Sequence, residues 1–299
     1  MGVIIFFAVS GFVIPLSVRK SEKWKDFLLG RFFRLYPAYW LSLLVHLVLY
    51  QLGSRSVSAQ GSEGLLVWVV NMSMLQMFFG FKNINLVAWT LGLEWIIYLT
   101  AIGMIQLKAK LNPQRLLWSS TFVLAILATV VPLVLHKRIP VAAPQCLIAA
   151  LFGYALLLAV DSVLTTRTWA FYALLNLISQ LLAATVNYQL FPKADAEIPF
   201  SAIIVSIGLA YLGFCALFRY RHVAFPSVVT WVGKISYSIY LFHGLVIYFC
   251  VRAVPGAGGM ILSLVLTLLL GALLFQYVEA PFQSLGSRLR RKGRIRPVD

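Results

Sequence analysis

The sequence predicts an all-α protein, a polytopic membrane helix bundle with about nine spanning helices and one re-entrant or interfacial helix at residues 65–81. Two observations carry this prediction. Hydrophobic residues make up 61% of the 299-residue chain and charged residues only 11%, whereas soluble domains average about 25% charged residues. The apolar residues also gather into long runs, and about 20 such residues are enough for a helix to cross a bilayer. Lipid is therefore the expected solvent for most of the chain, whose mean hydropathy is +0.88.

The first three predicted spans cover residues 2–18, 36–53 and 85–107. Basic residues that begin at Arg19 end the first span. The second is expected to start near Pro37, because proline breaks or restarts a helix. Lys108 follows the third span.

Six further spans are predicted at residues 116–135, 141–160, 169–190, 199–218, 235–252 and 258–278. No internal repeat and no low-complexity linker divides the chain. We therefore expect a single integral-membrane domain over residues 1–299, in which the basic segment 283–299 forms a cytoplasmic tail.

The distribution of basic residues predicts the orientation, because cytoplasmic loops of membrane proteins are enriched in Lys and Arg. If residues 65–81 do not cross, 19 of the 25 Lys and Arg residues are cytoplasmic and 6 lie outside. If they do cross, the division becomes 11 inside and 14 outside. We therefore expect residues 65–81 to stay at the outer face and the C-terminus to be cytoplasmic. The same count places Met1 outside, so a leading helix is expected ahead of it.

The net charge of +16 does not indicate nucleic-acid binding, since the basic residues lie between the apolar runs and in the tail. The three cysteines are far apart in sequence, and no metal-ligand spacing occurs. We expect neither a nucleic-acid partner nor a bound metal.

Glu94 is a carboxylate near the middle of an apolar helix. Ionisable residues inside the membrane are costly and usually face the protein interior or a water-filled cavity. Thr90 and Tyr98 share its helical face at i−4 and i+4, and Trp89 and Trp95 flank it. Glu94 is either an active-site acid or base, or a structural anchor between helices.

A second polar group is the stripe of Ser236, Tyr240 and His243, at i, i+4 and i+7 of one predicted helix. Such a stripe could handle protons or orient a hydroxyl, or it could bond one helix to another.

A third polar group is the pair Arg31 and Arg34, which share one helical face at the expected cytoplasmic rim. Paired guanidiniums suit phosphate, although topology alone would also explain them. His46, His136 and His222 are isolated and receive no role.

Five segments together resemble the acyltransferase-3 family of bacterial membrane O-acyltransferases, which includes surface polysaccharide O-acetylases. In chain order they are GVIIFFAVSGFVI (2–14), RFFRLYPAYW (31–40), WTLGLEWIIYL (89–99), ISYSIYLFH (235–243) and YVEAPF (277–282). Each is weak alone, but five in the family's order spread over nearly the whole chain.

The resemblance implies a bacterial inner-membrane enzyme that takes an acyl group, usually acetyl, from cytoplasmic acyl-CoA as donor substrate, with no bound cofactor. The acceptor would be a hydroxyl of a surface glycan or of its lipid-linked precursor. Arg31 and Arg34 match the family's R-x-x-R motif and would bind the CoA end. Glu94 matches the glutamate of the active centre, supported by Trp89, Thr90, Tyr98, Ser236 and Tyr240.

Two departures from the family pattern affect this interpretation. Gly92 stands where the family motif usually has Ser, and the family's first helix, with its catalytic histidine, is missing. The chain is therefore expected to be N-terminally truncated, with His243 as the substitute histidine. Two alternatives stay open: a proton-coupled transporter or flippase that uses Glu94 and His243 as a relay, and an inactive acyltransferase remnant.

Overall fold

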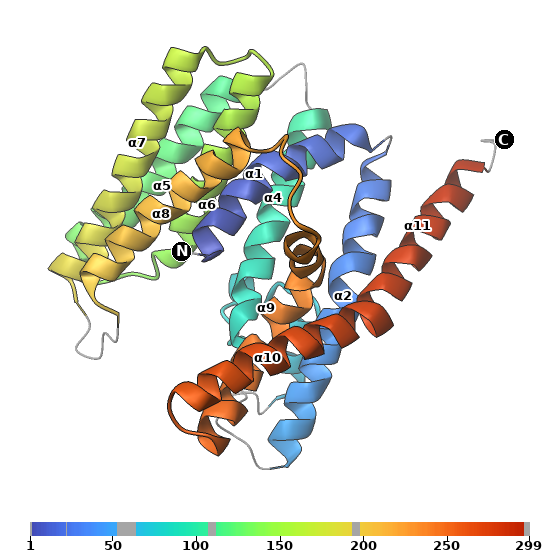
Figure 1. Cartoon of the computed structure of the whole chain (residues 1–299). Helices are drawn as coiled ribbons and strands as arrows, with labels where there is room; N and C mark the ends of the chain where they lie inside the picture. Colours follow the sequence, from blue (N-terminus) through green and yellow to red (C-terminus); the bar gives the residue numbers. More distant parts are fainter. Residues whose placement is uncertain (1, 22, 53–63, 107–111, 193–197, 296–299) are drawn as a thin grey trace. The chain divides into compact units, whose positions relative to one another are not determined.

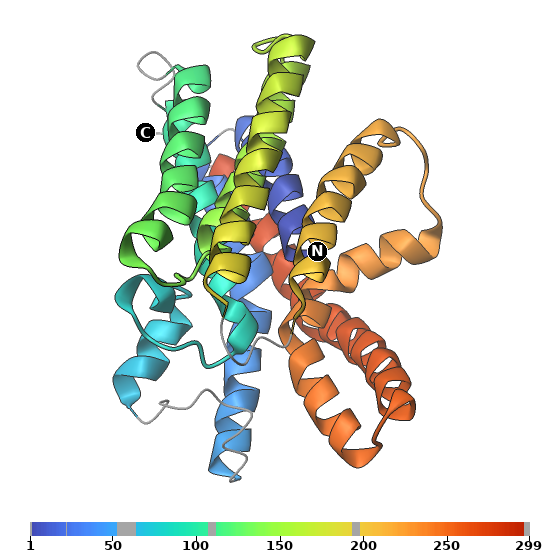
Figure 2. The same cartoon turned by 90° about the vertical axis from the view of Figure 1, so that its left-hand side faces the viewer.

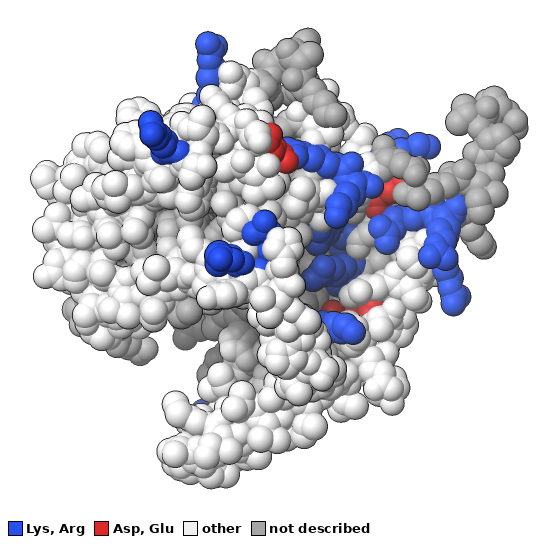
Figure 3. Space-filling model, turned by 45° about the horizontal axis from the view of Figure 1, so that its top comes forward, with Lys and Arg blue, Asp and Glu red and all other residues white. Residues whose placement is uncertain are grey.

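The computed structural model describes residues 2–21, 23–52, 64–106, 112–192 and 198–295, and these residues form helices and no strands (Figure 1). Nine of the described helices are long and apolar enough to cross a membrane. The predicted all-α membrane bundle is therefore confirmed. Most of the face shown in Figure 3 carries neither basic nor acidic side chains, as a surface in contact with lipid requires.

The helices follow one another with short connections. Their bounds are α1 (Gly2–Lys20), α2 (Trp24–Gln51), α3 (Leu65–Met72), η1 (Gln76–Phe79), η2 (Leu86–Ala88), α4 (Trp89–Gln106), α5 (Pro113–Leu135), α6 (Ala142–Val160), α7 (Thr166–Ala184), η3 (Thr185–Leu190), α8 (Phe200–Arg219), α9 (Ser227–Ala253), α10 (Ala257–Leu274), η4 (Phe275–Glu279) and α11 (Ala280–Ile295). The elements η1 and η2 are 3₁₀ helices, and η3 and η4 are π-helical turns.

Two predicted boundaries were wrong. Pro37 lies inside α2 and does not break it, so the second span starts at Trp24 and includes Arg31 and Arg34. The segment that begins at 283 is not an irregular tail, because α10, η4 and α11 form one continuous helical stretch as far as Ile295. Local composition misled both predictions, since contacts with neighbouring helices stabilise these two segments.

The segment 65–81 contains no spanning helix. The helix α3 has 8 residues and is about 12 Å long at 1.5 Å per residue, far short of a bilayer. Met74 follows it with a φ of 63°, a conformation that stops a helix in an L-residue. Its position at the outer face stays a prediction.

Three aromatic side chains of α2 bind the C-terminal carbonyls of α3. Tyr39 Oη donates to Asn71 O at 2.7 Å, Trp40 Nε1 to Met72 O at 3.0 Å, and Tyr36 Oη to Ser73 O at 3.0 Å. The last carbonyls of a helix have no partner within it, and in lipid such groups are costly. The YPAYW part of the second motif therefore holds the short helix in place.

The chain forms two compact units, with residues 1–20 and 93–223 in unit 1 and residues 21–92 and 224–299 in unit 2. The boundary falls inside α4, between Gly92 and Leu93. The single domain over residues 1–299 stays a prediction.

In unit 1, α1 and α6 pack closely because glycines lie at their contact. A methyl group at Gly11 would come 1.8 Å from the carbonyl oxygen of Ala150, and one at Gly153 would come 1.8 Å from that of Ala8. Small residues at i and i+3 on both helices thus allow the backbones to touch, as is common between membrane helices.

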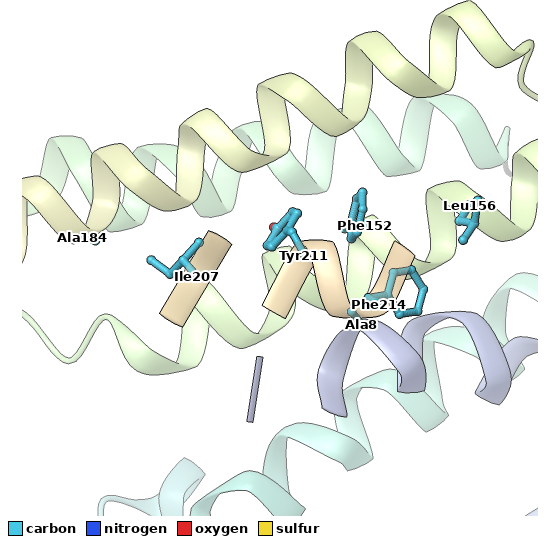
Figure 4. Close-up of a cluster of buried hydrophobic side chains, with 7 residues drawn as sticks. All are labelled: Ala8, Phe152, Leu156, Ala184, Ile207, Tyr211 and Phe214. Carbon is cyan, nitrogen blue, oxygen red and sulfur yellow. The ribbon is translucent and has the colours of Figure 1, made fainter. Parts of the chain in front are cut away.

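The core of unit 1 is apolar and aromatic (Figure 4). Phe152 of α6 stacks on Tyr211 of α8 with ring centroids 4.5 Å apart. Tyr211 Oη also donates to Asn176 Oδ1 of α7, so α6, α7 and α8 are joined by packing and by an interhelical hydrogen bond.

In unit 2, α9 and α10 form an antiparallel hairpin (Figure 1 and Figure 2). The stretch from η4 into α11 packs on α2. Gly286 of α11 lies against Phe33, where a methyl group would come 2.7 Å from Phe33 Cβ.

Candidate active site

Glu94 lies in α4 and is 6% exposed. Tyr98 Oη, one turn later and fully buried, donates to Glu94 Oε1 at 2.5 Å. The Tyr98 ring in turn meets Trp95 edge to face at 5.7 Å between centroids. The predicted pairing of Glu94 with Tyr98 therefore exists, and the carboxylate accepts a charge-assisted hydrogen bond in a protein interior.

Thr90 does not bond Glu94 in the structure. Its hydroxyl lies 2.7 Å from the hydroxyl of Tyr240 in α9, and both hydroxyls donate to the carbonyl of Val87, at 3.0 and 2.9 Å. Thr90 and Tyr240 thus join the start of α4 to α9 within unit 2. Trp89 is half-buried at the first residue of α4.

The three-residue stripe on α9 separates into different environments. Ser236 is exposed and donates only to Gly233 O of its own helix, at 2.8 Å. His243 is half-buried, with its Nδ1 2.8 Å from Tyr240 O and its ring tilted on the Tyr240 ring at 5.9 Å. Tyr240 is the member of the stripe whose side chain bonds another element.

Arg31 and Arg34 lie on one face near the start of α2, as predicted. The Arg31 guanidinium sits 5.0 Å from the centre of the Phe27 ring. The Arg34 side chain is exposed and interacts electrostatically with Glu279. Arg290 of α11 adds a third guanidinium here, because its Nη1 would lie 3.0 Å from a Cβ placed on Gly30.

Glu279 is an acid whose position sequence reasoning left unused. It is 2% exposed in η4 and accepts a hydrogen bond from Ser238 Oγ of α9. Its place in the YVEAPF motif was the available indication, since a carboxylate in an apolar run needs a partner.

A cavity of about 130 Å³ lies within unit 2, between α2, η2 and α9. His46, Asn85 and Tyr248 supply its polar lining. His46, which received no role from the sequence, is 5% exposed. Its isolation in sequence concealed that Asn85 and Tyr248 lie beside it in the fold.

A larger cavity of about 380 Å³ lies within unit 1, between α1, α4, α5 and α6. Its walls are mainly apolar and include Ile97 and Ala101, which follow Glu94 along α4. The volume falls in the range of about 300–1,000 Å³ usual for small-molecule sites.

Comparison with known proteins identifies the chain. The acyltransferase-3 family model, described as an acyltransferase domain, matches residues 1–276. A curated relative, acyltransferase MdmB of Streptomyces mycarofaciens, is 24% identical over 333 aligned positions, which cover 100% of this chain and 83% of the relative. No solved structure gives a significant match.

The family match covers more than nine-tenths of the chain and includes both compact units. It also includes Arg31, Arg34, Glu94 and His243. A match of this extent, on a helical membrane fold, supports transferase activity and not a transporter. The chain therefore belongs to the acyltransferase-3 family and is a membrane acyltransferase.

Proposed function

We propose that this acyltransferase moves an acyl group, most simply acetyl, from cytoplasmic acyl-CoA to a hydroxyl of a surface glycan or of its lipid-linked precursor. The membrane is the bacterial inner membrane, with the C-terminus in the cytoplasm. The excess of Lys and Arg in the corresponding loops supports this orientation.

The guanidinium cluster at the start of α2 is the observation that carries the donor assignment. Arg31, Arg34 and Arg290 come from two helices that pack in one unit. The diphosphate and 3′-phosphate of CoA carry several negative charges, and guanidinium forks bind phosphate oxygens bidentately. Glu279 restrains Arg34 electrostatically, which favours a fixed site over a mobile surface charge.

Glu94 has the role of orienting or charge-stabilising the reacting groups. A buried carboxylate that accepts from Tyr98 holds a fixed negative charge, and a preorganised charge near a reacting centre is worth more in a dry site than in water. The apolar cavity in unit 1 suits the lipid part of a lipid-linked acceptor.

Acetyl-CoA binding tests the donor assignment. Arg31→Lys and Arg34→Lys keep the charge but lose the fork, so each should weaken acetyl-CoA binding by about 1.5–3 kcal/mol. Arg115→Gln, an exposed residue of α5, is the matched control for loss of one positive charge and should leave the affinity within about twofold. Calorimetric titration of the purified chain gives these values. Unchanged affinity in an Arg31→Ala, Arg34→Ala double variant would refute the assignment.

The acceptor is tested in cells. The chain is expressed in a strain that lacks its surface-glycan O-acetyltransferase, and O-acetyl esters on the purified glycan are measured. Restored esters are expected, and Glu94→Gln should abolish most of them while the protein still inserts. Acyl esters found on a non-sugar hydroxyl would contradict the glycan assignment.

A further inference from the structure

The cavity in unit 2 holds a histidine whose ring is fixed in one tautomer. His46 Nδ1 lies 2.7 Å from the backbone oxygen of Ser42, one turn earlier in α2. A carbonyl oxygen only accepts, so Nδ1 must carry the hydrogen. The ring is buried, and no carboxylate among the described residues forms an ion pair with it. The neutral form is therefore favoured, and its Nε2 presents a lone pair.

The Nε2 atom of His46 is available to a ligand. Within the described part of the chain, no protein group bonds this nitrogen, and the ring lines the cavity. A histidine with a fixed Nδ1 hydrogen and a free Nε2 in a cavity is arranged as a base that can accept a proton.

The cavity wall beside His46 is held by a saturated amide. Asn85 Nδ2 donates to Ser42 Oγ at 3.2 Å and to Leu241 O at 3.1 Å, and Asn85 Oδ1 accepts from Val87 N at 3.2 Å. This amide joins α2, η2 and α9. The relative positions of His46 and the opposite wall are thus fixed by hydrogen bonds within one compact unit.

A cation lies near the other polar residue of the cavity. Arg252 Nη1 donates to Tyr248 Oη at 2.8 Å, and the guanidinium lies 5.2 Å from the centre of the Tyr248 ring. The hydrogen bond from a cation polarises the phenol and makes its O–H a better donor. Tyr248 could then donate to an oxygen that gains negative charge during reaction.

We propose that His46 is the general base of acyl transfer and that this cavity receives the acceptor hydroxyl together with a short acyl group. The inference rests on the function proposed above. As the acceptor oxygen attacks the thioester carbonyl, its proton passes to His46 Nε2 and a carbon–oxygen bond forms. The carbon–sulfur bond then breaks, and the imidazolium returns the proton to the departing thiolate, which gives free CoA thiol and an ester.

The geometry agrees with this division of roles. Arg34 and His46 are 12 residues apart on α2, or about 18 Å along the axis at 1.5 Å per residue. A donor whose phosphates bind near Arg34 must therefore extend its linear pantetheine arm along the helix to bring its thioester to His46. The volume of about 130 Å³ equals that of about four waters at roughly 30 Å³ each. This admits an acetyl group and a hydroxyl but not a long acyl chain.

Two substitutions at His46 separate chemistry from structure. His46→Asn retains a donor near the position of Nδ1 and loses the base at Nε2. His46→Gln retains an amide near the position of Nε2 but loses the hydrogen bond to Ser42. If His46 is the base, both variants should lose about 10²-fold or more in kcat. The KM for acetyl-CoA should stay within about twofold, because the phosphate site is distant.

The assay uses the purified 299-residue chain with acetyl-CoA as donor and dodecyl maltoside as a probe acceptor, since it presents sugar hydroxyls on an alkyl chain. Released thiol is followed by colour and acetyl maltoside by mass spectrometry. Imidazole should restore part of the activity of His46→Ala. His222→Gln, an exposed loop histidine, is the matched control and should retain full activity.

The outcomes are distinct. Loss in both variants, with unchanged thermal unfolding and rescue by imidazole, supports the inference. Full activity of His46→Asn, or loss confined to His46→Gln, overturns it and leaves the proposed function standing. Release of no thiol by the unaltered chain overturns the proposed function and this inference with it.

Discussion

The contact between α1 and α6 permits a quantitative test of the fold. At Gly11, an added methyl carbon would lie 1.8 Å from the carbonyl oxygen of Ala150 and 2.6 Å from its carbonyl carbon. Ordinary van der Waals contacts start at 3.4 Å. Since both atoms belong to backbone, no side-chain rotation can relieve the clash. Gly11→Ala must therefore move the helices apart by about 1.5 Å, which is the shortfall in that distance.

The cost follows from overpacking and from the loss of contact along the seam. Overpacking a filled site costs about 1–3 kcal/mol. A helical Gly→Ala change gains about 0.5–1 kcal/mol where space is free. Because the obstruction is rigid, we expect the high end of the first range, and a net destabilisation of about 1–2 kcal/mol after the gain is subtracted.

Equilibrium unfolding in mixed micelles titrated with dodecyl sulfate, followed by tryptophan fluorescence, measures this value. Gly208→Ala in α8 is the matched control, because nothing lies within 4 Å of its added methyl group. It should be neutral or more stable by up to about 1 kcal/mol. If Gly11→Ala unfolds at the same point as Gly208→Ala, the close backbone crossing of α1 and α6 is wrong.

Three further predictions concern other parts of the molecule. Tyr39→Phe should destabilise the protein by about 1–3 kcal/mol, because Asn71 O loses its buried donor at the end of α3; the same unfolding titration measures this, and an unchanged midpoint would contradict it. Tyr98→Phe should lower acetyl transfer while leaving acetyl-CoA affinity unchanged, because it removes the hydroxyl that orients Glu94; transfer equal to that of the unaltered chain would limit Tyr98 to packing. In a cysteine-free background, Lys82→Cys should react with an impermeant thiol reagent added to intact spheroplasts, and Ser284→Cys should react only after lysis; the reverse pattern would invert the orientation.

The sequence alone determined the number and approximate position of the spanning helices. The length and apolarity of a run are local properties, so the nine spans needed no knowledge of neighbours. It also identified Arg31 and Arg34 as a pair on one face, because their spacing fixes this in any helix that includes both. The pairing of Glu94 with Tyr98 was predictable for the same reason.

The tertiary structure decided which sides of these helices face protein. In a soluble helix the apolar stripe marks the core, but a membrane helix is apolar all round because lipid is as apolar as leucine. The pattern therefore could not show that Ser236 is exposed, that Thr90 bonds Tyr240, or that Gly11 touches Ala150. His46 looked like a packed core residue, and only the approach of Asn85 and Tyr248 from distant segments makes it part of a cavity. Helix existence depends on short stretches of sequence, whereas a site depends on which helices meet, and that is set by packing over the whole chain.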